Sequence, residues 1–526
     1  MTGKSSVGCA FSGEGSRHFQ TFNPITDKSN PTIFTEATAA EVDRAVDLAQ
    51  EAFSILPTIS TAQTADFLEE IFRQILFVGD ELVDCFVSET GLTIERAIAE
   101  RTRMLKQLHS FADLVRNNAW REPSIDSGDI HRNPKKPDLR KMLVGIGPVV
   151  VFGASNFPFA YSTAGGDTVS AFAAGCPVIV KSHPLHAGTG ELVANAIVAA
   201  ALKTGMPKGI FSNLNAIGLE VGKQLVLHPK IKAVGFTGSI SGGRALFDLA
   251  NSRMEPIPVF AEMGSVNPVV ILPETLSENN EKWSDLLADS ITSGVGQFCT
   301  NPGLLLLLES IETTNFLETL VTKVLITEAA PMLHTSIVER FESAKQAACS
   351  VPFISLNEQK GEIPVNAVRQ TILTVNASVF KSNPILQDEV FGPFTLIVIC
   401  KNIYELEDSV AVLKGQLTGT IMGSVENSKK YKSIFTTLHQ KVGRLIFNEV
   451  PTGVEVCSSM HHGGPYPAST DSRFTAVGID AIKRFARPLV YQNFPEELLP
   501  EILRDENIAK IERRINGERT KRDVHG

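Results

Sequence analysis

The feature that most constrains the fold is a regular alternation of strand-like and helix-like segments between residues 142 and 251. Four apolar runs that are typical of strands lie at 142–153, 177–180, 209–214 and 231–236. Four segments with helical periodicity follow them in turn, at 164–174, 189–204, 220–227 and 242–251. Repeated strand–helix units predict a Rossmann-like, doubly wound parallel sheet. Because ligands of such sheets bind beyond the carboxyl ends of the strands, we expect a nucleotide after Phe152, Val180 and Phe236.

The remaining sequence predicts further domains around this sheet. A chain of 526 residues is too long for one hydrophobic core. We expect a nucleotide-binding domain over residues 18–120 and 141–259, because amphipathic helices precede the alternating region. A second α/β domain is predicted over residues 260–455. Residues 1–17 are rich in Gly and Ser and residues 508–526 are highly charged, so both termini are expected to be flexible.

One cysteine stands among small residues in the loop 293–303. Cys299 follows a helix-like segment and precedes the apolar run 304–308. A thiol attacks a carbonyl carbon as thiolate, and neighbouring glycines let a substrate approach the sulfur closely. The alternative is a buried core cysteine. Upstream, Glu262 ends an apolar segment and is followed by small residues that would let it face a cleft.

A glycine- and serine-rich turn follows the strand that ends near Phe236. Thr237, Gly238 and Ser239 lead directly into the next helix. The amide groups at a helix N-terminus carry partial positive charge and bind phosphate groups. Similar turns are common at strand ends, but the strand–helix context favours a phosphate-binding function here.

Composition excludes several other classes of protein. The chain has 58 acidic against 49 basic residues, so no basic field attracts nucleic acid or anionic lipid. Its seven cysteines are odd in number and contain no C-x-x-C pair, which argues against a disulfide framework or a zinc site and favours a reducing compartment. No secretory signal or membrane-spanning run is visible. We therefore predict a cytoplasmic protein without a metal.

Five stretches, in this order, resemble the aldehyde dehydrogenase superfamily. They are Ser155-Asn156-Phe157-Pro158, Val178-Ile179-Val180-Lys181, Phe236-Thr237-Gly238-Ser239, residues 260–268 and residues 297–303. The resemblance covers about residues 20 to 500 and implies an oxidation of an aldehyde to a carboxylate through a thiohemiacetal and a thioester. It implies that Cys299 is the nucleophile, that Glu262 activates the hydrolytic water, and that Asn156 stabilises the oxyanion.

The resemblance also implies a nicotinamide cofactor, NADP or NAD. The expected cofactor-binding residues are Lys181, Ser182, His183, Thr237, Gly238, Ser239, Glu389 and Phe391. Superfamily members that prefer NAD often have a glutamate three residues after the lysine, and this chain has Pro184 there. Because no carboxylate repels a 2′-phosphate at that position, we expect both cofactors to bind.

The substrate is less defined by the sequence. The segments 261–268, 297–303 and 462–470 resemble bacterial 2-oxoglutarate semialdehyde dehydrogenases and their fatty-aldehyde relatives. A substrate with a distal carboxylate needs a cation such as Arg103, which could instead belong to an exposed ion-pair network, whereas a fatty chain needs an apolar tunnel.

Two alternatives to a dehydrogenase remain. One is a non-catalytic binding member of the fold, and the other is a thiol hydrolase in which His183 or His461 activates Cys299. For the assembly, the family architecture implies that residues 121–140 and 485–500 form a small β oligomerisation flap, and hence a homodimer or homotetramer.

Overall fold

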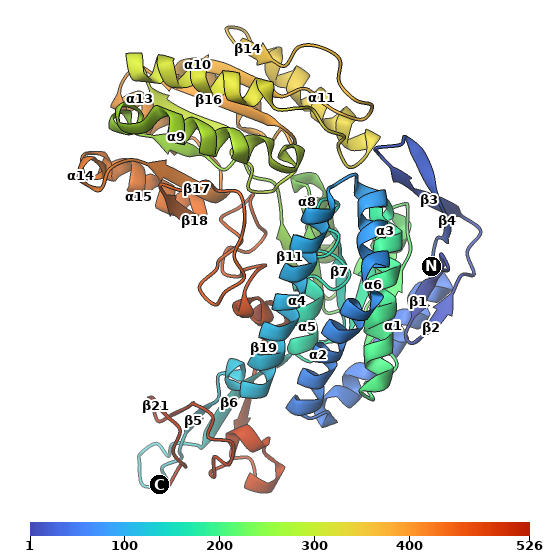
Figure 1. Cartoon of the computed structure of the whole chain (residues 1–526). Helices are drawn as coiled ribbons and strands as arrows, with labels where there is room; N and C mark the ends of the chain where they lie inside the picture. Colours follow the sequence, from blue (N-terminus) through green and yellow to red (C-terminus); the bar gives the residue numbers. More distant parts are fainter. Residues whose placement is uncertain (526) are drawn as a thin grey trace.

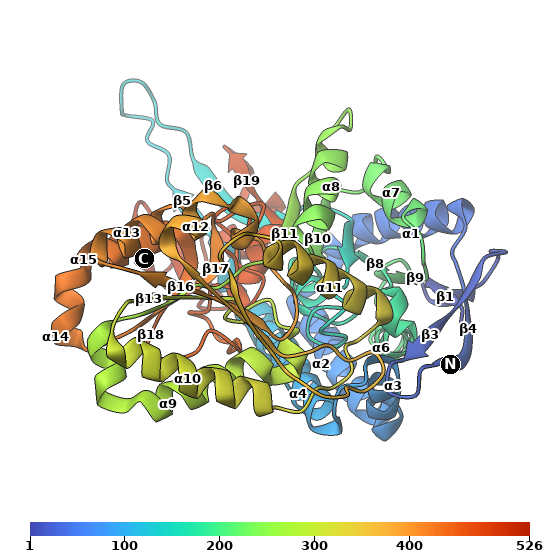
Figure 2. The same cartoon turned by 90° about the horizontal axis from the view of Figure 1, so that it is seen from above.

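The computed structural model describes residues 1–525, apart from the side chains of residues 427 and 428. Two large lobes, each built around its own sheet, lie side by side, and a smaller sheet projects from them (Figures 1 and 2). The first lobe contains the N-terminal half of the chain and the second contains most of residues 269–447. This is the mixed α/β organisation that the sequence predicts.

The first sheet has the strand order β11-β10-β7-β8-β9-β1-β2. Its strands are β1 (Ser5–Val7), β2 (Ala10–Ser12), β7 (Val149–Phe152), β8 (Val178–Lys181), β9 (Phe211–Leu214), β10 (Ala233–Thr237) and β11 (Val259–Glu262). The five strands from β7 to β11 are parallel, and β1 and β2 extend the sheet antiparallel. The predicted doubly wound core is therefore present.

Helices cover both faces of this sheet. They are α1 (Ala39–Ile55), α2 (Thr61–Val78), α3 (Asp80–Thr90), α4 (Ile94–Asn117), α5 (Gly166–Ala173), α6 (Ala187–Lys203), α7 (Glu220–Leu227) and α8 (Ile240–Asn251). Val149 and Val151 pack against one helical layer and Val150 against the other, as the two-residue period of a strand requires. Burial on both faces explains why the strands read as continuous apolar runs.

The second lobe contains a sheet with the order β14-β15-β16-β13-β12-β17-β18. Its strands are β12 (Val269–Ile271), β13 (Leu304–Leu308), β14 (Ser355–Glu358), β15 (Thr371–Asn376), β16 (Phe394–Cys400), β17 (Gln416–Met422) and β18 (Val442–Phe447). Its helices are α9 (Pro273–Thr292), α10 (Ile311–Ile326), α11 (Thr335–Cys349), α12 (Ala377–Ser382), α13 (Ile403–Ala411), α14 (Val425–Ser428) and α15 (Lys432–Lys441). Leu304 and Leu306 face one apolar core, and Leu305 and Leu307 face the other.

A third sheet and a hairpin complete the described chain. The third sheet has the order β19-β6-β5-β20-β21, with β5 (Ser124–Asp126), β6 (Leu139–Gly145), β19 (Ala486–Gln492), β20 (Arg513–Ile515) and β21 (Glu518–Thr520). The hairpin consists of β3 (His18–Asn23) and β4 (Lys28–Thr35). Strand β5, within the segment 121–140, and strand β19, within the segment 485–500, belong to one sheet with β6 between them.

The structure differs from the predictions at both termini. Residues 1–17 are not loosely held, because β1 pairs with β9 and so joins the first sheet. Residues 508–526 were also expected to be flexible, but β20 pairs with β5 through Arg514 and Ile515. These strands are short and flanked by polar residues, so local sequence carries little sign of them. Their partners lie far away in the chain and supply the hydrogen bonds.

Two boundaries also differ from the prediction. Strand β11 ends at Glu262 and belongs to the first sheet, so the second lobe begins after it and not at residue 260. The apolar run 142–153 forms two strands in different sheets, because Gly147 has a φ of 134° and Pro148 follows it. A proline after a glycine in such a conformation ends one strand and redirects the chain.

One helical segment, Pro184–Lys203, is apolar and long enough to cross a bilayer. In the structure 72% of its most apolar part is buried inside the protein. Its apolar residues pack against neighbouring helices and the first sheet. It is therefore a core helix and not a membrane span.

Candidate active site

A cavity of about 570 Å³ lies where the two lobes meet. It collects nearly all of the residues that the sequence predicts for the site: Asn156, Lys181, His183, Thr237, Gly238, Ser239, Glu262, Cys299, Glu389 and Phe391. The carboxyl ends of β7, β8, β10 and β11 open into it, as expected for a doubly wound sheet. Ser182 is the exception, since it is buried behind the cavity wall and its Oγ has no hydrogen-bond partner among the described residues.

The Cys299 loop has an unusual backbone. Gly294, Val295 and Gly296 have φ values of 56°, 58° and 64°, in the left-handed region. A β-branched residue such as Val295 rarely adopts this conformation, so its buried side chain must compensate for the strain. A Cβ atom on Gly296 would lie well inside van der Waals distance of the Gly392 carbonyl. The Cys299 loop and the Glu389–Phe391 loop therefore fit together backbone against backbone.

Asn267 holds the Cys299 loop from the other side. Its Nδ2 donates to the backbone oxygens of Cys299 at 2.8 Å and Asn301 at 2.9 Å. Its Oδ1 accepts a hydrogen bond from Thr418 on β17 at 2.9 Å. Asn267 is fully buried, so these bonds have no competition from water. The nucleophile is thus positioned by the segment that follows Glu262.

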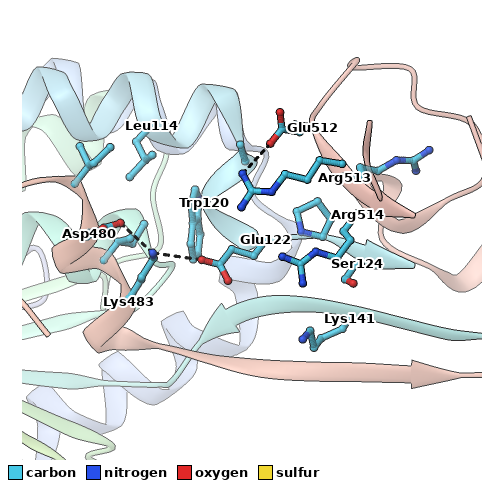
Figure 3. A pocket seen from close by; sticks show the side chains of 15 residues that line it. Leu114, Trp120, Glu122, Ser124, Lys141, Asp480, Lys483, Glu512, Arg513 and Arg514 are labelled. Atoms are coloured by element: carbon cyan, nitrogen blue, oxygen red, sulfur yellow. Dashed lines mark hydrogen bonds and ion pairs between the residues drawn. The ribbon is translucent and has the colours of Figure 1, made fainter. Parts of the chain in front are cut away.

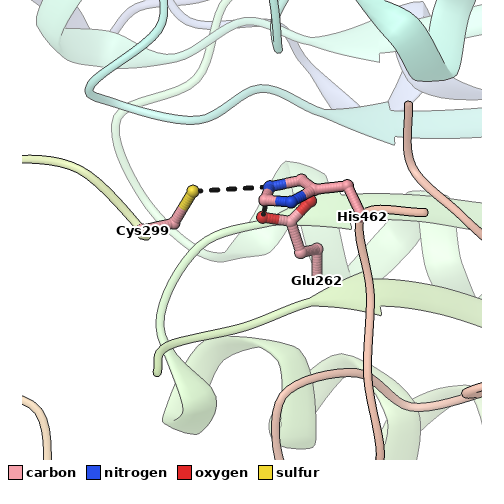
Figure 4. A group of neighbouring side chains, drawn as sticks. All are labelled: Glu262, Cys299 and His462. Carbon is pink, nitrogen blue, oxygen red and sulfur yellow. Dashed lines mark hydrogen bonds and ion pairs between the residues drawn. The ribbon is translucent and has the colours of Figure 1, made fainter. Parts of the chain in front are cut away.

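The nucleophile Cys299 forms a cluster with two buried side chains, Glu262 and His462 (Figure 4). His462 Nε2 lies 3.5 Å from Cys299 Sγ and 2.9 Å from Glu262 Oε1. His462 is 1% exposed and Glu262 is 4% exposed, so both groups interact in a medium of low polarity. One imidazole nitrogen therefore faces both the nucleophile and the expected base.

His462 reaches this position through a segment that runs alongside β11. Met263 N donates to Ala468 O at 2.8 Å, and Ala261 N donates to Thr470 Oγ1 at 2.9 Å. These bonds place His462 beside the end of the strand that carries Glu262. In the sequence, the segment 462–470 is recognised only by its resemblance to a family motif. Nothing in its local pattern indicates which histidine points toward the sulfur.

The two histidines that the sequence suggested as activators of Cys299 lie elsewhere. His183 lines the nucleotide side of the cavity and stacks on His186, with ring centroids 5.0 Å apart. His461 is half-buried, and its neighbour His462 makes the contact with Cys299 instead. The suggestion of His461 was therefore wrong, since the neighbouring residue His462 contacts the sulfur.

The electrostatics of the site disfavour a resting thiolate. Burial raises the pKa of the Cys299 thiol well above its ordinary value, and the carboxylates of Glu262 and Glu389 raise it further. Arg103 acts in the opposite direction but does not outweigh them. The thiol is therefore protonated at rest, and attack on a carbonyl requires a base that takes its proton.

Asn156 links the oxyanion position to the nucleophile loop. Its Nδ2 donates one hydrogen to Gln297 O at 2.9 Å. A carboxamide nitrogen carries two hydrogens, so the second is available to a ligand in the cavity that Asn156 and Cys299 line together. This geometry suits the predicted stabilisation of an oxygen that gains negative charge.

The nucleotide half of the cavity is formed by β8, β10 and the start of α8. Ser239 is the N-cap of α8, because its Oγ accepts from Gly242 N at 3.2 Å. Burial lowers the pKa of the Lys181 ammonium to about 8, an effect that Glu36 only partly opposes. Lys181 is therefore a cation whose charge depends on pH near the physiological range.

Glu389 and Phe391 line the cavity from the second lobe. Burial raises the pKa of Glu389 to about 7, and Ser265 N, at 3.4 Å, is its weak hydrogen-bond donor. Helix α11 adds Arg340, which the sequence analysis did not single out. It was missed because only the tertiary structure brings α11 over the cavity.

An aromatic and cationic wall lies next to the nucleophile. Arg103 of α4 donates to Tyr161 Oη at 2.9 Å, and its guanidinium lies 5.1 Å from the centre of that ring. Arg96, one helical heptad earlier, sits between Phe157 and Phe298, at 4.5 and 4.6 Å from the ring centres. Arg103 is half-buried in this wall, so its interpretation as part of an exposed ion-pair network is wrong.

A second cavity, of about 340 Å³, lies beside the third sheet (Figure 3). It contains none of the predicted site residues. Several of its charged groups already pair within it: Lys483 contacts Glu122 and Asp480, and Arg519 contacts Glu512. These ion pairs therefore already satisfy charged groups that a ligand in this cavity would otherwise contact.

Comparison with known proteins agrees with this site. The model of the aldehyde dehydrogenase family matches residues 11–484. Alpha-ketoglutaric semialdehyde dehydrogenase 2 of Azospirillum brasilense is 42% identical over 98% of this chain and 99% of its own length. The alpha-ketoglutaric semialdehyde dehydrogenase of Acinetobacter baylyi is 42% identical over 92% of each chain.

Solved structures share the fold. Betaine aldehyde dehydrogenase of Staphylococcus aureus, in complex with NAD+, has a TM-score of 0.80 at 18% identity, covering 94% of this chain and 97% of its own. The 1-pyrroline-5-carboxylate dehydrogenase of Thermus thermophilus has a TM-score of 0.79 at 20% identity, with 93% and 92% coverage. The chain belongs to the aldehyde dehydrogenase family.

Proposed function

We propose that the protein oxidises 2-oxoglutarate semialdehyde to 2-oxoglutarate with NADP or NAD. The observation that carries the proposal is the placement of Cys299, His462, Glu262 and Asn156 at one end of a nucleotide-sized cavity. A non-catalytic binding protein would need no such cluster. A thiol hydrolase would need no lysine, serine and glutamate along the rest of the cavity.

The cavity residues fit a dinucleotide cofactor. The N-terminus of α8 and Ser239 offer donors to phosphate groups, and Lys181 would bind the adenosine ribose. Glu389 and Phe391 would hold the nicotinamide half, and the buried Glu389 has only the weak bond from Ser265 to satisfy it. When bound, the cofactor accepts a hydride from the substrate.

Attack on the aldehyde begins with removal of the Cys299 proton. His462 Nε2 is close enough to accept it, and Glu262 stabilises the resulting imidazolium. The sulfur then forms a thiohemiacetal, whose oxygen receives a hydrogen bond from Asn156 Nδ2. Loss of hydride leaves a thioester on Cys299.

Hydrolysis of the thioester completes the cycle. Glu262 is buried next to the sulfur, and neither of its oxygens accepts a well-formed hydrogen bond from the described residues. It can therefore take a proton from a water molecule that attacks the thioester carbon. The products are the carboxylate and the free Cys299 thiol.

The proposed substrate rests on the wall beside Cys299 and on the two relatives at 42% identity. 2-Oxoglutarate semialdehyde carries a 2-oxo acid at the end opposite the aldehyde. Arg103 Nε and Arg96 Nη2 are buried without a hydrogen-bond partner among the described residues, so each has a donor to offer a carboxylate. A fatty chain would leave these two donors unsatisfied.

A comparison of substrates tests this assignment. We expect kcat/KM for 2-oxoglutarate semialdehyde to exceed that for a C10 aldehyde, with succinic semialdehyde between them. Arg103→Met should lower kcat/KM for 2-oxoglutarate semialdehyde about ten- to a hundredfold, since a charge-assisted hydrogen bond contributes about 1.5–3 kcal/mol. The C10 aldehyde should be little affected.

Arg101 provides the control for that variant. It lies on the same helix but donates to Gly79 O at 3.0 Å, away from Cys299. Arg101→Met should therefore leave substrate preference unchanged. Equal losses for both substrates in Arg103→Met, or a preference of the parent for the C10 aldehyde, would contradict the assignment.

For the assembly and location, we propose a homodimer or homotetramer in the cytoplasm. The third sheet supports the assembly, because β19 is an edge strand whose outer side pairs with no other described strand. Seven free cysteines support a reducing compartment.

A further inference from the structure

The cluster of Cys299, His462 and Glu262 has the composition of a site for a thiophilic divalent cation (Figure 4). The possible ligand atoms Sγ, Nε2 and a carboxylate oxygen all lie within 4.8 Å of one another. Thiolate, imidazole and carboxylate are the three ligand types that Zn²⁺ takes from proteins. The sequence indicated no such site, because its ligands are 37 and 163 residues apart and form no short motif.

The separations from His462 Nε2 to the other two ligand atoms are close to those around a shared ion. Tetrahedral Zn²⁺ with bonds of about 2.3 Å to sulfur and about 2.0 Å to nitrogen or oxygen separates S from N by about 3.6 Å and N from O by about 3.3 Å. The corresponding distances here are 3.5 Å from Cys299 Sγ to His462 Nε2 and 2.9 Å from His462 Nε2 to Glu262 Oε1. These two pairs differ from the tetrahedral values by a few tenths of an ångström, and the sulfur and the carboxylate oxygen lie within 4.8 Å of each other.

The existing contacts of these groups also leave their ligand atoms able to bind a metal ion. Both oxygens of Glu262 are buried without a well-formed hydrogen bond among the described residues. His462 is held through its backbone, since its N–H donates to Thr475 Oγ1 at 2.8 Å. Cys299 and Glu262 line the main cavity, which provides an entry path and room for a water molecule as fourth ligand.

We propose that this cluster is a reversible inhibitory site for Zn²⁺ or a similar thiophilic cation. Binding joins the metal to Cys299 Sγ, His462 Nε2 and a Glu262 oxygen, and the thiol proton passes to solvent. The occupied sulfur cannot attack an aldehyde, so inhibition competes with the aldehyde. Hard cations such as Mg²⁺, which prefer oxygen ligands in octahedral geometry, do not bind there.

Direct binding measurements on the full-length, chelator-treated protein test this proposal without relying on activity. Competition with a chromophoric zinc chelator should reveal one tight site per chain, and Co²⁺ should produce a sulfur-to-cobalt charge-transfer band. Cys299→Ser should abolish the band. His462→Gln and Glu262→Gln should each weaken Zn²⁺ binding at least about tenfold, as loss of even an outer-shell partner does.

Two matched controls separate this site from other zinc binding. His461→Gln removes the neighbouring histidine, and Cys457→Ser removes an exposed thiol. Both should bind Zn²⁺ like the parent. Circular dichroism and Tm should show that the Cys299 and His462 variants remain folded. If Cys299→Ser is unstable, Co²⁺ binding to His462→Gln, which keeps Cys299, gives a second measurement.

Activity assays give the functional half of the test. Micromolar-range Zn²⁺ should raise the apparent KM for aldehyde in the parent, and a chelator should restore it, whereas Mg²⁺ should have no effect. A charge-transfer band that persists in Cys299→Ser, or equal Zn²⁺ affinity in the parent and His462→Gln, would overturn the proposal. The binding measurements do not depend on turnover. A failure of the proposed dehydrogenase function can therefore be distinguished from a failure of the proposed metal site.

Discussion

At the scale of single residues, the site depends on proton positions that burial controls. Cys299 is a thiol at rest because burial and two nearby carboxylates raise its pKa. His462 supplies the only imidazole contact to the sulfur among the described residues. Glu262 contacts the same imidazole nitrogen. Activation of the nucleophile therefore uses His462, and hydrolysis of the thioester uses the neighbouring base Glu262. Substituting each residue separately should distinguish the two steps.

Substitution of Glu262 by glutamine should block the second half of the reaction. A carboxamide cannot take a proton from water, so steady-state turnover should fall about a hundredfold or more. A burst of reduced cofactor in stopped-flow measurements should remain, since His462 still faces Cys299. Loss of the burst together with turnover would mean that Glu262 also acts before hydride transfer.

His462→Gln should instead slow the burst itself. The half-buried thiol then has no imidazole to take its proton, and the burst rate should become strongly dependent on pH, rising toward high pH as the thiol ionises unaided. His461→Gln is the matched control and should behave like the parent. An unchanged burst in His462→Gln would assign the proton transfer to Glu262 or to water.

The charge of Lys181 predicts a pH-dependent cofactor preference. Its pKa is lowered to about 8, so the ammonium is charged below that pH and neutral above it. A 2′-phosphate gains more from this charge than a ribose hydroxyl does. The ratio of kcat/KM for NADP to that for NAD should therefore fall as pH rises through about 8. Lys181→Arg, which stays charged, should show a flat ratio, and a flat ratio in the parent would refute the assignment.

At the scale of elements, the catalytic loop is held in shape by its neighbours. Gly296 packs against the Gly392 carbonyl, and Asn267 bonds the backbone of Cys299. The loop that carries the nucleophile is thus coupled to the loop that carries Glu389 and to the segment after Glu262. A change in this contact should affect the cofactor and the nucleophile together.

Gly296→Ala tests this coupling. A methyl group there overlaps the Gly392 backbone, and φ of 64° costs an L-residue a further 1–2 kcal/mol or so. We expect a lower Tm and a rise in KM for the cofactor as well as a loss of kcat. Gly453→Ala is the control, because its φ of 95° is also positive but nothing lies within 4 Å of the added methyl. Equal effects of the two substitutions would show that backbone strain alone, not the contact with Gly392, matters.

At the scale of the whole molecule, the third sheet connects distant parts of the chain. It joins strands from residues 124–145 to strands from residues 486–520 and projects from the two lobes (Figure 1). Its edge strand β19 exposes Val490, which is 51% accessible in the single chain. An exposed edge strand with apolar side chains is suited to pairing with another copy.

Val490→Asp should therefore reduce assembly without unfolding the chain. We expect light scattering to give a homodimer or homotetramer for the parent and a smaller species for the variant, because a charge on a buried interface is costly. Gln492→Asp, at an exposed position near the end of the same strand, adds the same charge and serves as a comparison. A monomeric parent would refute the proposed role of the sheet.

The alternation of strands and helices, the apolar runs and the motif residues were all readable from the sequence. These features are local, because a strand buried on both faces needs consecutive apolar residues and a phosphate turn needs glycine and serine at fixed spacing. The doubly wound sheet, and candidates such as Cys299 and Glu262 that the structure brings together in one cavity, could therefore be named before the structure was known.

Other features were decided only by the tertiary structure. The placement of His462 beside Cys299, the docking of Arg340 and the pairing of both termini into sheets all join residues that are far apart in the chain. Local sequence determines whether a segment tends to form a helix, a strand or a turn. It does not determine which distant segment will satisfy the backbone hydrogen bonds of that segment. His462 faces the sulfur, and His461 does not, because the segment that follows it bonds to β11 in one register.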